Sequence, residues 1–220
     1  MDPSEGDNLD HYSPGALDGS RAGFFDANVN NLPKRPSHEM EATLLHEAVP
    51  GHHLQIARAQ EIQGLPIHRR IGGYVAYSEG WGLYAESLGY EMGLYKDPYQ
   101  RFGALALEML RACRLVVDTG LHSKGWTRSQ AISYLADNTG YHPEVAAAEI
   151  DRYIVMPGQA LGYKIGELRI KALRAKAAAA LGERFDLRRF HNAILDDGAL
   201  PLTVLESRID EWIENERKKR

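Results

Sequence analysis

The feature that most constrains the fold is the pair Pro50-Gly51, which stands inside an otherwise helical stretch. Proline cannot donate the backbone hydrogen bond that a helix needs at this point, and its ring clashes with the preceding turn. Glycine, in contrast, tolerates an unusual backbone. A regular helix through both residues is therefore unfavourable. We expect a kink or a bulge here, and helix bulges are frequent at functional sites.

The residues around this break resemble a stretched zinc-binding motif. In the helical H-E-x-x-H arrangement, two histidines one turn apart bind Zn²⁺, and the glutamate beside the first activates a water molecule. Here His46 and Glu47 are followed by His52 and His53, six and seven positions after His46. On a straight helix His52 would point about 120° away and His53 would lie about 10 Å along the axis. If two residues are looped out, His52 becomes the second ligand and Glu47 remains beside the metal as a general base.

A carboxylate further along the chain offers a third ligand. Glu79 follows His52 by 27 positions, at the start of a predicted helix. Catalytic zinc sites use three protein ligands and leave one position open. Glu86 lies on the same helical face and could hold a ligand histidine through its second nitrogen, or it could be an ordinary solvated residue. The alternative for the whole motif is that Pro50-Gly51 ends one helix and the histidines lie on a surface turn.

Composition excludes several classes of protein. With 220 residues, 44% hydrophobic and 25% charged, the chain suits one large globular domain. A net charge of −4 gives no basic field, so we expect no nucleic-acid partner. The single cysteine, Cys113, excludes an internal disulfide. No apolar run approaches the ~18 residues of a membrane span, and the N-terminus lacks a signal peptide's apolar stretch. We therefore expect no membrane partner and a soluble, cytoplasmic chain, or an exported one if the sequence belongs to a longer precursor.

The predicted fold class is mainly α, in one domain with two parts. Residues 1–36 are rich in Gly, Pro, Asp and Asn and form an extended segment, with one or two strands expected within residues 21–32. Residues 37–220 are predicted to be helical. Ser37, Thr127 (with Gln130) and Asp186 have the side chains of helix N-caps, and another helix is expected to begin near Asp97-Pro98. The expected helices are 37–63, 78–94, 98–123, 127–139, 143–156, 159–181, 186–196 and one from 201 onward.

Three motifs together resemble a known bacterial family. They are His46-Glu47-x-x-Pro-Gly-His52-His53-Leu54-Gln55, Glu79-Gly80-Trp81-x-Leu83-Tyr84-x-Glu86 and Pro157-Gly158-Gln159-Ala160-Leu161-x-Tyr163-x-x-Gly166. They look like the family called domain of unknown function 885 and run, with their surroundings, from about residue 12 to 205. That family is similar to the gluzincin metallopeptidases, including the Taq-type carboxypeptidases, and dipeptidyl peptidase III has a similarly lengthened motif.

The resemblance implies a helical, zincin-like catalytic domain with one Zn²⁺ per chain. Taq-type carboxypeptidases have glycine directly before the second histidine, which favours His52 over His53 as the ligand. The metal set is then His46, His52 and Glu79, with His53 and Glu86 in supporting positions. Family members are usually much longer than this chain. An N-terminal region outside this sequence, or an oligomer, is therefore expected to complete the cleft.

Further polar residues near Pro157-Gly158 are candidates for substrate contact. A tyrosine hydroxyl near the metal can donate to a developing oxyanion, and we place Tyr163 first and Tyr153 second in this role. Arg152 could hold a peptide carboxylate by two hydrogen bonds, with Gln159 beside it. His122 ends a helical stripe that also contains Arg111, Arg114 and Asp118 and could line the cleft. The alternatives are half-buried packing tyrosines and a solvated polar stripe.

Two classes of function remain open. The first is a zinc-dependent peptidase acting on a peptide substrate, with a carboxypeptidase as one form of it. The second is a non-catalytic helical module for binding or regulation that keeps the metal motif. A metal-dependent hydrolase of a small non-peptide amide lies between them.

Overall fold

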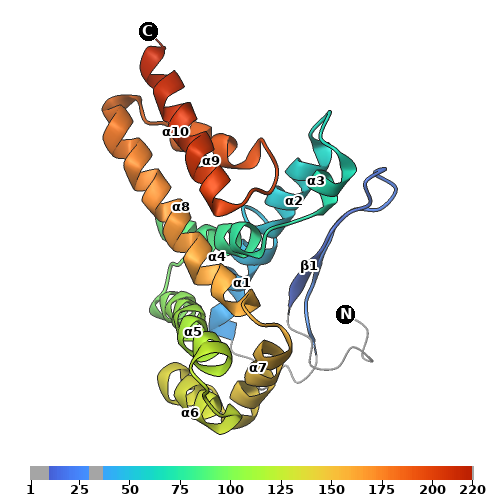
Figure 1. Ribbon diagram of the computed structural model, residues 1–220, viewed down its shortest axis with the longest axis vertical. Coiled ribbons are helices and arrows are strands. Elements are labelled where there is room, and N and C mark those ends of the chain that lie inside the picture. Colours follow the sequence, from blue (N-terminus) through green and yellow to red (C-terminus); the bar gives the residue numbers. More distant parts are fainter. Residues whose placement is uncertain (1–9, 30–36, 220) are drawn as a thin grey trace.

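A computed structural model describes residues 10–29 and 37–219, and within them the chain is mainly helical (Figure 1). Two short strands, β1 (His11–Ser13) and β2 (Phe24–Asp26), pair antiparallel as a hairpin with Tyr12 opposite Phe25. The hairpin lies beside α2 and α3 in Figure 1. The helical elements are η3 (Ser37–Glu39), α1 (Met40–Glu47), α2 (His52–Glu61), α3 (Ile67–Ile71), α4 (Val75–Glu91), α5 (Pro98–Ser123), α6 (Arg128–Thr139), α7 (Pro143–Val155), α8 (Gln159–Leu181), η4 (Gly182–Arg184), α9 (Leu187–Leu195) and α10 (Leu202–Lys218).

The expected break at Pro50-Gly51 is present, in a different form from a bulge. α1 ends at Glu47 and α2 begins at His52, so one helix stops and another starts. The Val49–Pro50 peptide bond is cis. A Cβ atom on Gly51 would lie 1.9 Å from the carbonyl oxygen of His46, so only glycine fits there. The indole nitrogen of Trp81 donates to the Pro50 carbonyl at 2.8 Å, which fixes the turn against α4.

Most helix starts agree with the capping residues found in the sequence. Thr127 forms the predicted capping box on α6, and Asp186 caps α9. The structure adds a capping box at Asp97, where α5 was expected to begin. The predicted Ser37 cap is wrong, because Ser37 begins a 3₁₀ turn and α1 starts only at Met40. α4 begins at Val75, three residues before the predicted start, and the short helix α3 was not predicted. β2 lies in the expected segment, β1 precedes it, and residues 30–36 lie outside the described chain.

Glycines bring α4 and α8 into backbone contact. A Cβ on Gly166 would lie 1.8 Å from the carbonyl oxygen of Ala76, and one on Gly80 would lie 2.4 Å from the Cα of Gly166. A Cβ on Gly162 would meet Val75 at 2.6 Å. Small residues on both helices therefore allow an approach that side chains would prevent. The two helices cross at the centre of Figure 1.

Two hydrophobic cores lie on either side of this crossing. The first joins α4 and α8 to α9 and α10 around residues such as Trp81, Ile170 and Phe190. The second joins α5, α6 and α7 around Leu110, Leu135 and Ile150. Figure 1 shows α9 and α10 beside one end of α8 and α5–α7 near the other. The start of α8, where it meets α4, lies between these two cores.

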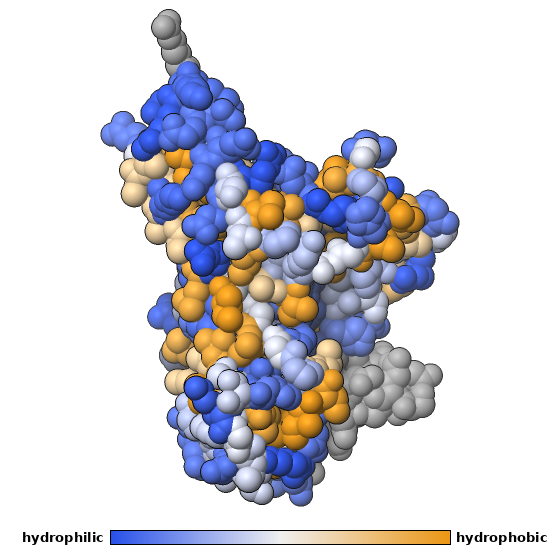
Figure 2. All heavy atoms as spheres, viewed as in Figure 1, coloured by the Kyte–Doolittle hydropathy of each residue, from blue (hydrophilic) through white to orange (hydrophobic). Residues whose placement is uncertain are grey.

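Hydrophobic residues also occupy part of the outer surface. One face of α5 is buried and includes Leu107. The opposite face of the helix is exposed and carries Phe102, Leu105, Met109 and Val116. Figure 2 shows apolar surface over α7, and Val155 at the end of that helix is exposed. Among the described residues, no helix combines the length and the hydropathy needed to cross a membrane.

We predict that Gly166→Ala destabilises the fold despite its better helix propensity. At other positions in a helix interior, replacing glycine with alanine raises the free energy of unfolding by up to about 1 kcal/mol. Here the methyl group would collide with the carbonyl oxygen of Ala76, and such overpacking costs about 1–3 kcal/mol or more. Urea denaturation would measure the free energy of unfolding. The reverse change at the exposed Ala175, Ala175→Gly, should cost about 1 kcal/mol by propensity alone. A gain in stability for Gly166→Ala would show that the helices can separate without cost.

Candidate metal centre

Three side chains from three helices converge on one point. The Nε2 atom of His46, in α1, lies 3.4 Å from Oε2 of Glu79, in α4. The Nε2 atom of His52, the first residue of α2, lies 3.2 Å from the same oxygen. One potential ligand atom from each residue lies within 4.8 Å of the others. The break at residues 48–51 makes this possible, because it lets His46 and His52 face the same carboxylate from two helices.

These residues fit a zinc ion by ligand type and by spacing. Imidazole nitrogens and a carboxylate oxygen are the donors of many catalytic zinc sites, with bonds of about 2.0–2.2 Å. Two such bonds at a tetrahedral angle place their ligand atoms about 3.4 Å apart. The observed 3.2 and 3.4 Å separations are close to this value and longer than a typical charge-assisted hydrogen bond of about 2.8 Å. The side chain of Glu79 is 19% exposed, so the cluster borders solvent.

The orientation of His46 is fixed from two sides. Its Nδ1 atom lies 2.7 Å from Oε1 of Glu86, and because a carboxylate only accepts, Nδ1 donates the hydrogen bond. This leaves Nε2 to face Glu79. On the other side, a Cβ atom on Gly82 would lie 2.6 Å from the imidazole, so the ring occupies the space of a missing side chain. Glu86 is therefore buried against the second nitrogen of His46, so it is not a solvated residue, while its support of a metal ligand remains a prediction.

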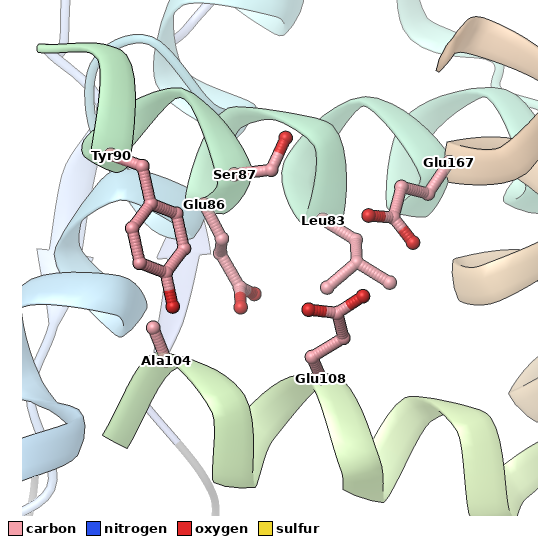
Figure 3. Close-up of a pocket in the computed structure, with 7 residues that line it drawn as sticks. All are labelled: Leu83, Glu86, Ser87, Tyr90, Ala104, Glu108 and Glu167. Atoms are coloured by element: carbon pink, nitrogen blue, oxygen red, sulfur yellow. The ribbon is translucent and has the colours of Figure 1, made fainter. Parts of the chain in front are cut away.

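Glu86 is itself held in place by an arginine of α5. Nη2 of Arg111, in α5, lies 3.1 Å from the same Oε1 atom. The other oxygen, Oε2, is buried and has no hydrogen-bond partner among the described residues. Glu86 also lines a cavity of about 10 Å³, together with Glu108 and Glu167 (Figure 3). A space of this size accommodates about one water molecule.

The electrostatics of the cluster follow from two imidazoles that share one carboxylate. Burial alone would lower the pKa of His46, but hydrogen bonds with Glu79 and Glu86 outweigh it and raise the pKa to about 9. For Glu79, burial opposes ionisation, while hydrogen bonds from His46 and His52 lower its pKa well below the ordinary value. The carboxylate of Glu79 is therefore held in its charged form.

Glu47 lies beside the cluster as the last residue of α1. Burial raises the pKa of its carboxyl, an effect that the nearby imidazoles of His46 and His52 partly oppose. A hydrogen bond from the backbone of Tyr12 in β1 also acts on this carboxyl. Glu47 is not among the converging ligand atoms, but it lies close enough to His46, His52 and Glu79 for their charges to act on its carboxyl.

His53 points away from the candidate ligands. Its Nδ1 atom lies 3.1 Å from the hydroxyl of Tyr12, and the two rings meet edge to face with centroids 5.3 Å apart. His53 therefore supports the hairpin rather than the ligand atoms. The Nδ1 atom of His52 is buried and has no hydrogen-bond partner among the described residues, in contrast to Nδ1 of His46.

Gln159 and Tyr163, on the first turns of α8, extend the cluster. The amide nitrogen of Gln159 lies 3.4 Å from Oε1 of Glu79 and 3.2 Å from the hydroxyl oxygen of Tyr163. The ring of Tyr163 stacks near His46 at 6.1 Å and lies 4.5 Å from the guanidinium of Arg114. Burial raises the pKa of Tyr163, so its hydroxyl keeps its proton. Gln159, predicted to bind substrate, thus contacts the candidate ligand Glu79 directly.

The other predicted substrate residues belong to a neighbouring buried network. Tyr153 is fully buried, and its hydroxyl bonds to Arg114 at 2.7 Å and to Glu149. Arg152 bonds to Glu149 at 3.1 Å and to Gln159 at 3.2 Å. His122 donates from Nε2 to the backbone carbonyl of Tyr153 at 3.0 Å. Arg152, Tyr153 and His122 therefore bond to other protein groups. Within the part of the chain that the structure describes, Gln159 is the residue that connects this network to Glu79.

Arg111, Arg114 and Asp118 of the polar stripe on α5 are buried, so the solvated alternative is wrong for these three, whereas His122 at the end of the stripe is exposed. Arg111 supports Glu86, and Arg114 pairs with Glu149 at 2.9 Å. Both carboxylate oxygens of Asp118 accept from the backbone nitrogen of Gly158, which fixes the start of α8. Sequence reasoning missed Glu149. The signal was present in its spacing, because Glu149, Arg152 and Tyr153 share one helical face.

Comparisons with known proteins identify a family and a fold for this chain, but they give no chemical activity. The sequence profile of a bacterial family described as proteins of unknown function (DUF885) matches residues 2–209. Among proteins of curated function, none matches the chain significantly. A solved "putative lipoprotein" from Colwellia psychrerythraea is 47% identical and superposes with a TM-score of 0.93 over 96% of this chain. A second solved protein, described as "a putative lipoprotein of unknown function" from Shewanella oneidensis, is 22% identical with a TM-score of 0.79 over 94% of this chain.

Both solved relatives are much longer than this chain. The shared region covers 36% of the Colwellia protein and 41% of the Shewanella protein. Well under half of either relative therefore corresponds to the fold described above. The expected cytoplasmic location of this chain remains a prediction.

We predict that zinc content depends on His52 and not on His53. His46→Ala, His52→Ala and Glu79→Ala each remove one converging donor and should lose bound zinc, measured by elemental analysis of purified protein. His53→Ala is the matched control, because it removes the neighbouring imidazole, which bonds to Tyr12. It should keep one zinc per chain. Zinc retained in His52→Ala and lost in His53→Ala would reverse the assignment.

A second prediction concerns pH and the buried Glu149. Burial would raise the pKa of this carboxyl, but Arg114, Arg152 and the Tyr153 hydroxyl lower it from 4.5 to about 2. Because folding lowers this pKa, the ionised carboxylate of Glu149 stabilises the folded protein above pH 4.5. This stabilisation is lost as the pH falls toward 2 and the carboxylate takes up a proton. As the pH falls through this range, the free energy of unfolding should therefore decrease by on the order of 3 kcal/mol more in the parent than in Glu149→Gln.

Chemical denaturation at a series of pH values would measure this difference. Glu144→Gln, at an exposed position of the same helix, is the matched control and should follow the parent. An acid dependence in Glu149→Gln as steep as that of the parent would mean that other carboxyl groups carry the effect.

Proposed function

We propose that this chain, which belongs to the bacterial DUF885 family, is the metal-binding part of a zinc-dependent hydrolase of peptide bonds. The observation that carries the proposal is the convergence of His46, His52 and Glu79, with the carboxyl of Glu47 beside them. A similarity to the gluzincin peptidases, and to carboxypeptidases among them, is part of the proposal.

The donor set supports one Zn²⁺ held by His46, His52 and Glu79. Glu86 and Gly82 support the same assignment, since together they aim Nε2 of His46 at Glu79. When bound, zinc would polarise a carbonyl oxygen and lower the pKa of a water molecule. A histidine that binds a metal through one ring nitrogen typically donates a hydrogen bond from the other nitrogen to a fixed partner. The Arg111–Glu86 pair gives His46 such a partner within a buried setting.

Glu47 is the proposed general base. Its side chain would take a proton from the attacking water and then give that proton to the leaving amine. A base works best when its pKa is near the working pH, and burial raises the pKa of Glu47 in that direction. The backbone hydrogen bond from Tyr12 would keep the carboxyl oriented during both transfers.

Tyr163 is the proposed donor to the developing oxyanion. Gln159 donates to its hydroxyl oxygen, so the hydroxyl proton is available for another acceptor. Arg114 lies over the ring and places positive charge near the position where negative charge would develop. Tyr153 is a weaker candidate for the same role, because its hydroxyl is bonded to Glu149 and Arg114 in the buried network.

The second candidate function is a non-catalytic binding module that keeps the metal site, and the exposed apolar face of α5 favours it. The shared fold covers only 36% and 41% of the two solved relatives. On this chain, α5 exposes Phe102, Leu105 and Met109 opposite its buried face. Further polypeptide packed against such surface would complete a cleft. A hydrolase of small non-peptide amides would use the same residues on a shorter substrate.

Glu47→Gln is the test that separates metal binding from chemistry. The substitution keeps the size of the side chain and removes the group that takes the proton. Zinc content and thermal unfolding should stay near those of the parent, while cleavage of a peptide library falls about 10²–10⁴-fold. Tyr163→Phe should cost about 10²-fold, as expected for one oxyanion donor.

The outcomes discriminate between the candidate functions. Undiminished cleavage by Glu47→Gln would mean that the activity comes from another site or from a contaminant. If the parent binds one zinc and cleaves no peptide, the module becomes the better assignment. Cleavage of small amides without cleavage of peptides would instead favour the amide hydrolase.

A further inference from the structure

A hollow of about 400 Å³ lies beside the candidate metal centre. Its walls come from the loop after β1, from α2, and from the segment between α3 and α4. This volume is in the range of pockets that bind small ligands. The hollow is separate from the small cavity in Figure 3, which lies between α4, α5 and α8.

The hollow is connected to the candidate ligands through two helices. Gln55 and Ile56 line it, and they follow His52 by three and four positions, which puts them one turn further on the same side of α2. Ser78 also lines it and directly precedes Glu79. A substrate with its reacting bond at the cluster would therefore have the hollow within reach of its next residues.

The charge of the lining is positive. Arg21 and Arg70 both line the hollow, and its lining residues include no aspartate or glutamate. Arg21 donates to the carbonyl of Pro14 at 2.6 Å, and Arg70 donates to the carbonyl of Gln60 at 2.8 Å. These bonds hold the guanidinium groups in place. Each guanidinium has five N–H donors, so further donors remain for a ligand.

Gln55 provides a second, independent indication of a ligand. The residue is only 4% exposed, and its Oε1 atom has no hydrogen-bond partner among the described residues. Native proteins rarely leave a buried polar group unsatisfied, and such a group calls for an explanation. A ligand N–H in the hollow would satisfy this atom, whereas leucine in its place would suit the fold alone.

We propose that this hollow binds the C-terminal end of a peptide substrate. Arg21 and Arg70 hold the carboxylate by charge-assisted hydrogen bonds, and Gln55 accepts a hydrogen bond from a backbone N–H of the same substrate. Ile56 packs against an apolar side chain. The peptide nature of the ligand rests on the proposed function. The inference adds that the enzyme selects free C-termini, so that cleavage releases the last residues of a chain.

Binding is measured with full-length, zinc-loaded Glu47→Gln protein, so that no probe is hydrolysed. Isothermal titration compares N-acetyl-alanyl-alanine with its C-terminal amide. The free acid should bind about tenfold or more tightly than the amide, because charge-assisted hydrogen bonds are about twice as strong as neutral ones. Adding Arg70→Ala should remove most of that preference. Arg58→Ala, which removes an arginine of α2 whose exposed ion pair is with Asp196 after α9, is the matched control and should keep the preference.

Gln55→Leu distinguishes a ligand contact from a packing role. It removes an unsatisfied buried amide, so the melting temperature should stay the same or rise. Affinity for the free acid should fall several-fold at the same time. A lower melting temperature with unchanged affinity would assign Gln55 to the fold and overturn its part in the proposal. This variant keeps the test usable if Arg70→Ala fails to fold.

Other outcomes identify other ligands or separate the two proposals. Equal affinity for acid and amide would overturn the proposal. So would tighter binding of N-acetyl-aspartyl-alanine amide, which carries its carboxylate on a side chain. If the acid preference is present but the parent cleaves no peptide, the carboxylate site stands and the proposed peptidase fails. If the parent cleaves amidated and free peptides equally well, the peptidase stands and this site fails.

Discussion

The backbone contact between α4 and α8 determines where most of the functional side chains lie. Gly80 and Gly166 let the two helices approach until their main chains touch. α4 carries Glu79 and Glu86, and the first turns of α8 carry Gln159 and Tyr163. A side chain at either glycine would separate the helices and move these residues apart. The geometry of the cluster is therefore set by residues that have no polar group of their own.

A chain of hydrogen bonds and ion pairs connects the candidate centre to the rest of the molecule. Arg111 supports Glu86, Glu86 orients His46, and His46 faces Glu79. On the other side, Gln159 connects Glu79 to Arg152, and Arg152 contacts Glu149. Buried charges of this kind are favourable only when each has partners. This explains why Arg111 and Arg114 of the polar stripe on α5 lie inside the protein, where they pair with α4 and α7.

The sequence predicts features that depend on a few neighbouring residues. The caps at Thr127 and Asp186 were correct, because a capping bond joins residues only three positions apart. The break at Pro50 was correct for the same local reason. The start of α1 was wrong, since Ser37 has the chemistry of a cap but lies in a 3₁₀ turn. The ligand assignment remains a prediction, although the structure brings the three proposed ligands together.

Features that join distant segments were beyond such reasoning. The direction of His53 depends on Tyr12, which comes 41 positions earlier in the hairpin. The stripe of Arg111, Arg114 and Asp118 has the same spacing whether it faces water or a second helix. Its burial became evident only once the positions of α4, α7 and α8 were known. Helical periodicity predicts which residues share a face, but it does not say what covers that face.

Gly82 has a consequence for protein engineering. The imidazole of His46 occupies the space in which any side chain at this position would lie. A designer who transfers the two histidines, Glu79 and Glu47 to another helical scaffold would copy every proposed reactive group and still lose the ring's position. The facing helix must also lack a side chain at one turn. Sequence searches for grafted or diverged versions of this centre should therefore include that glycine together with the ligands.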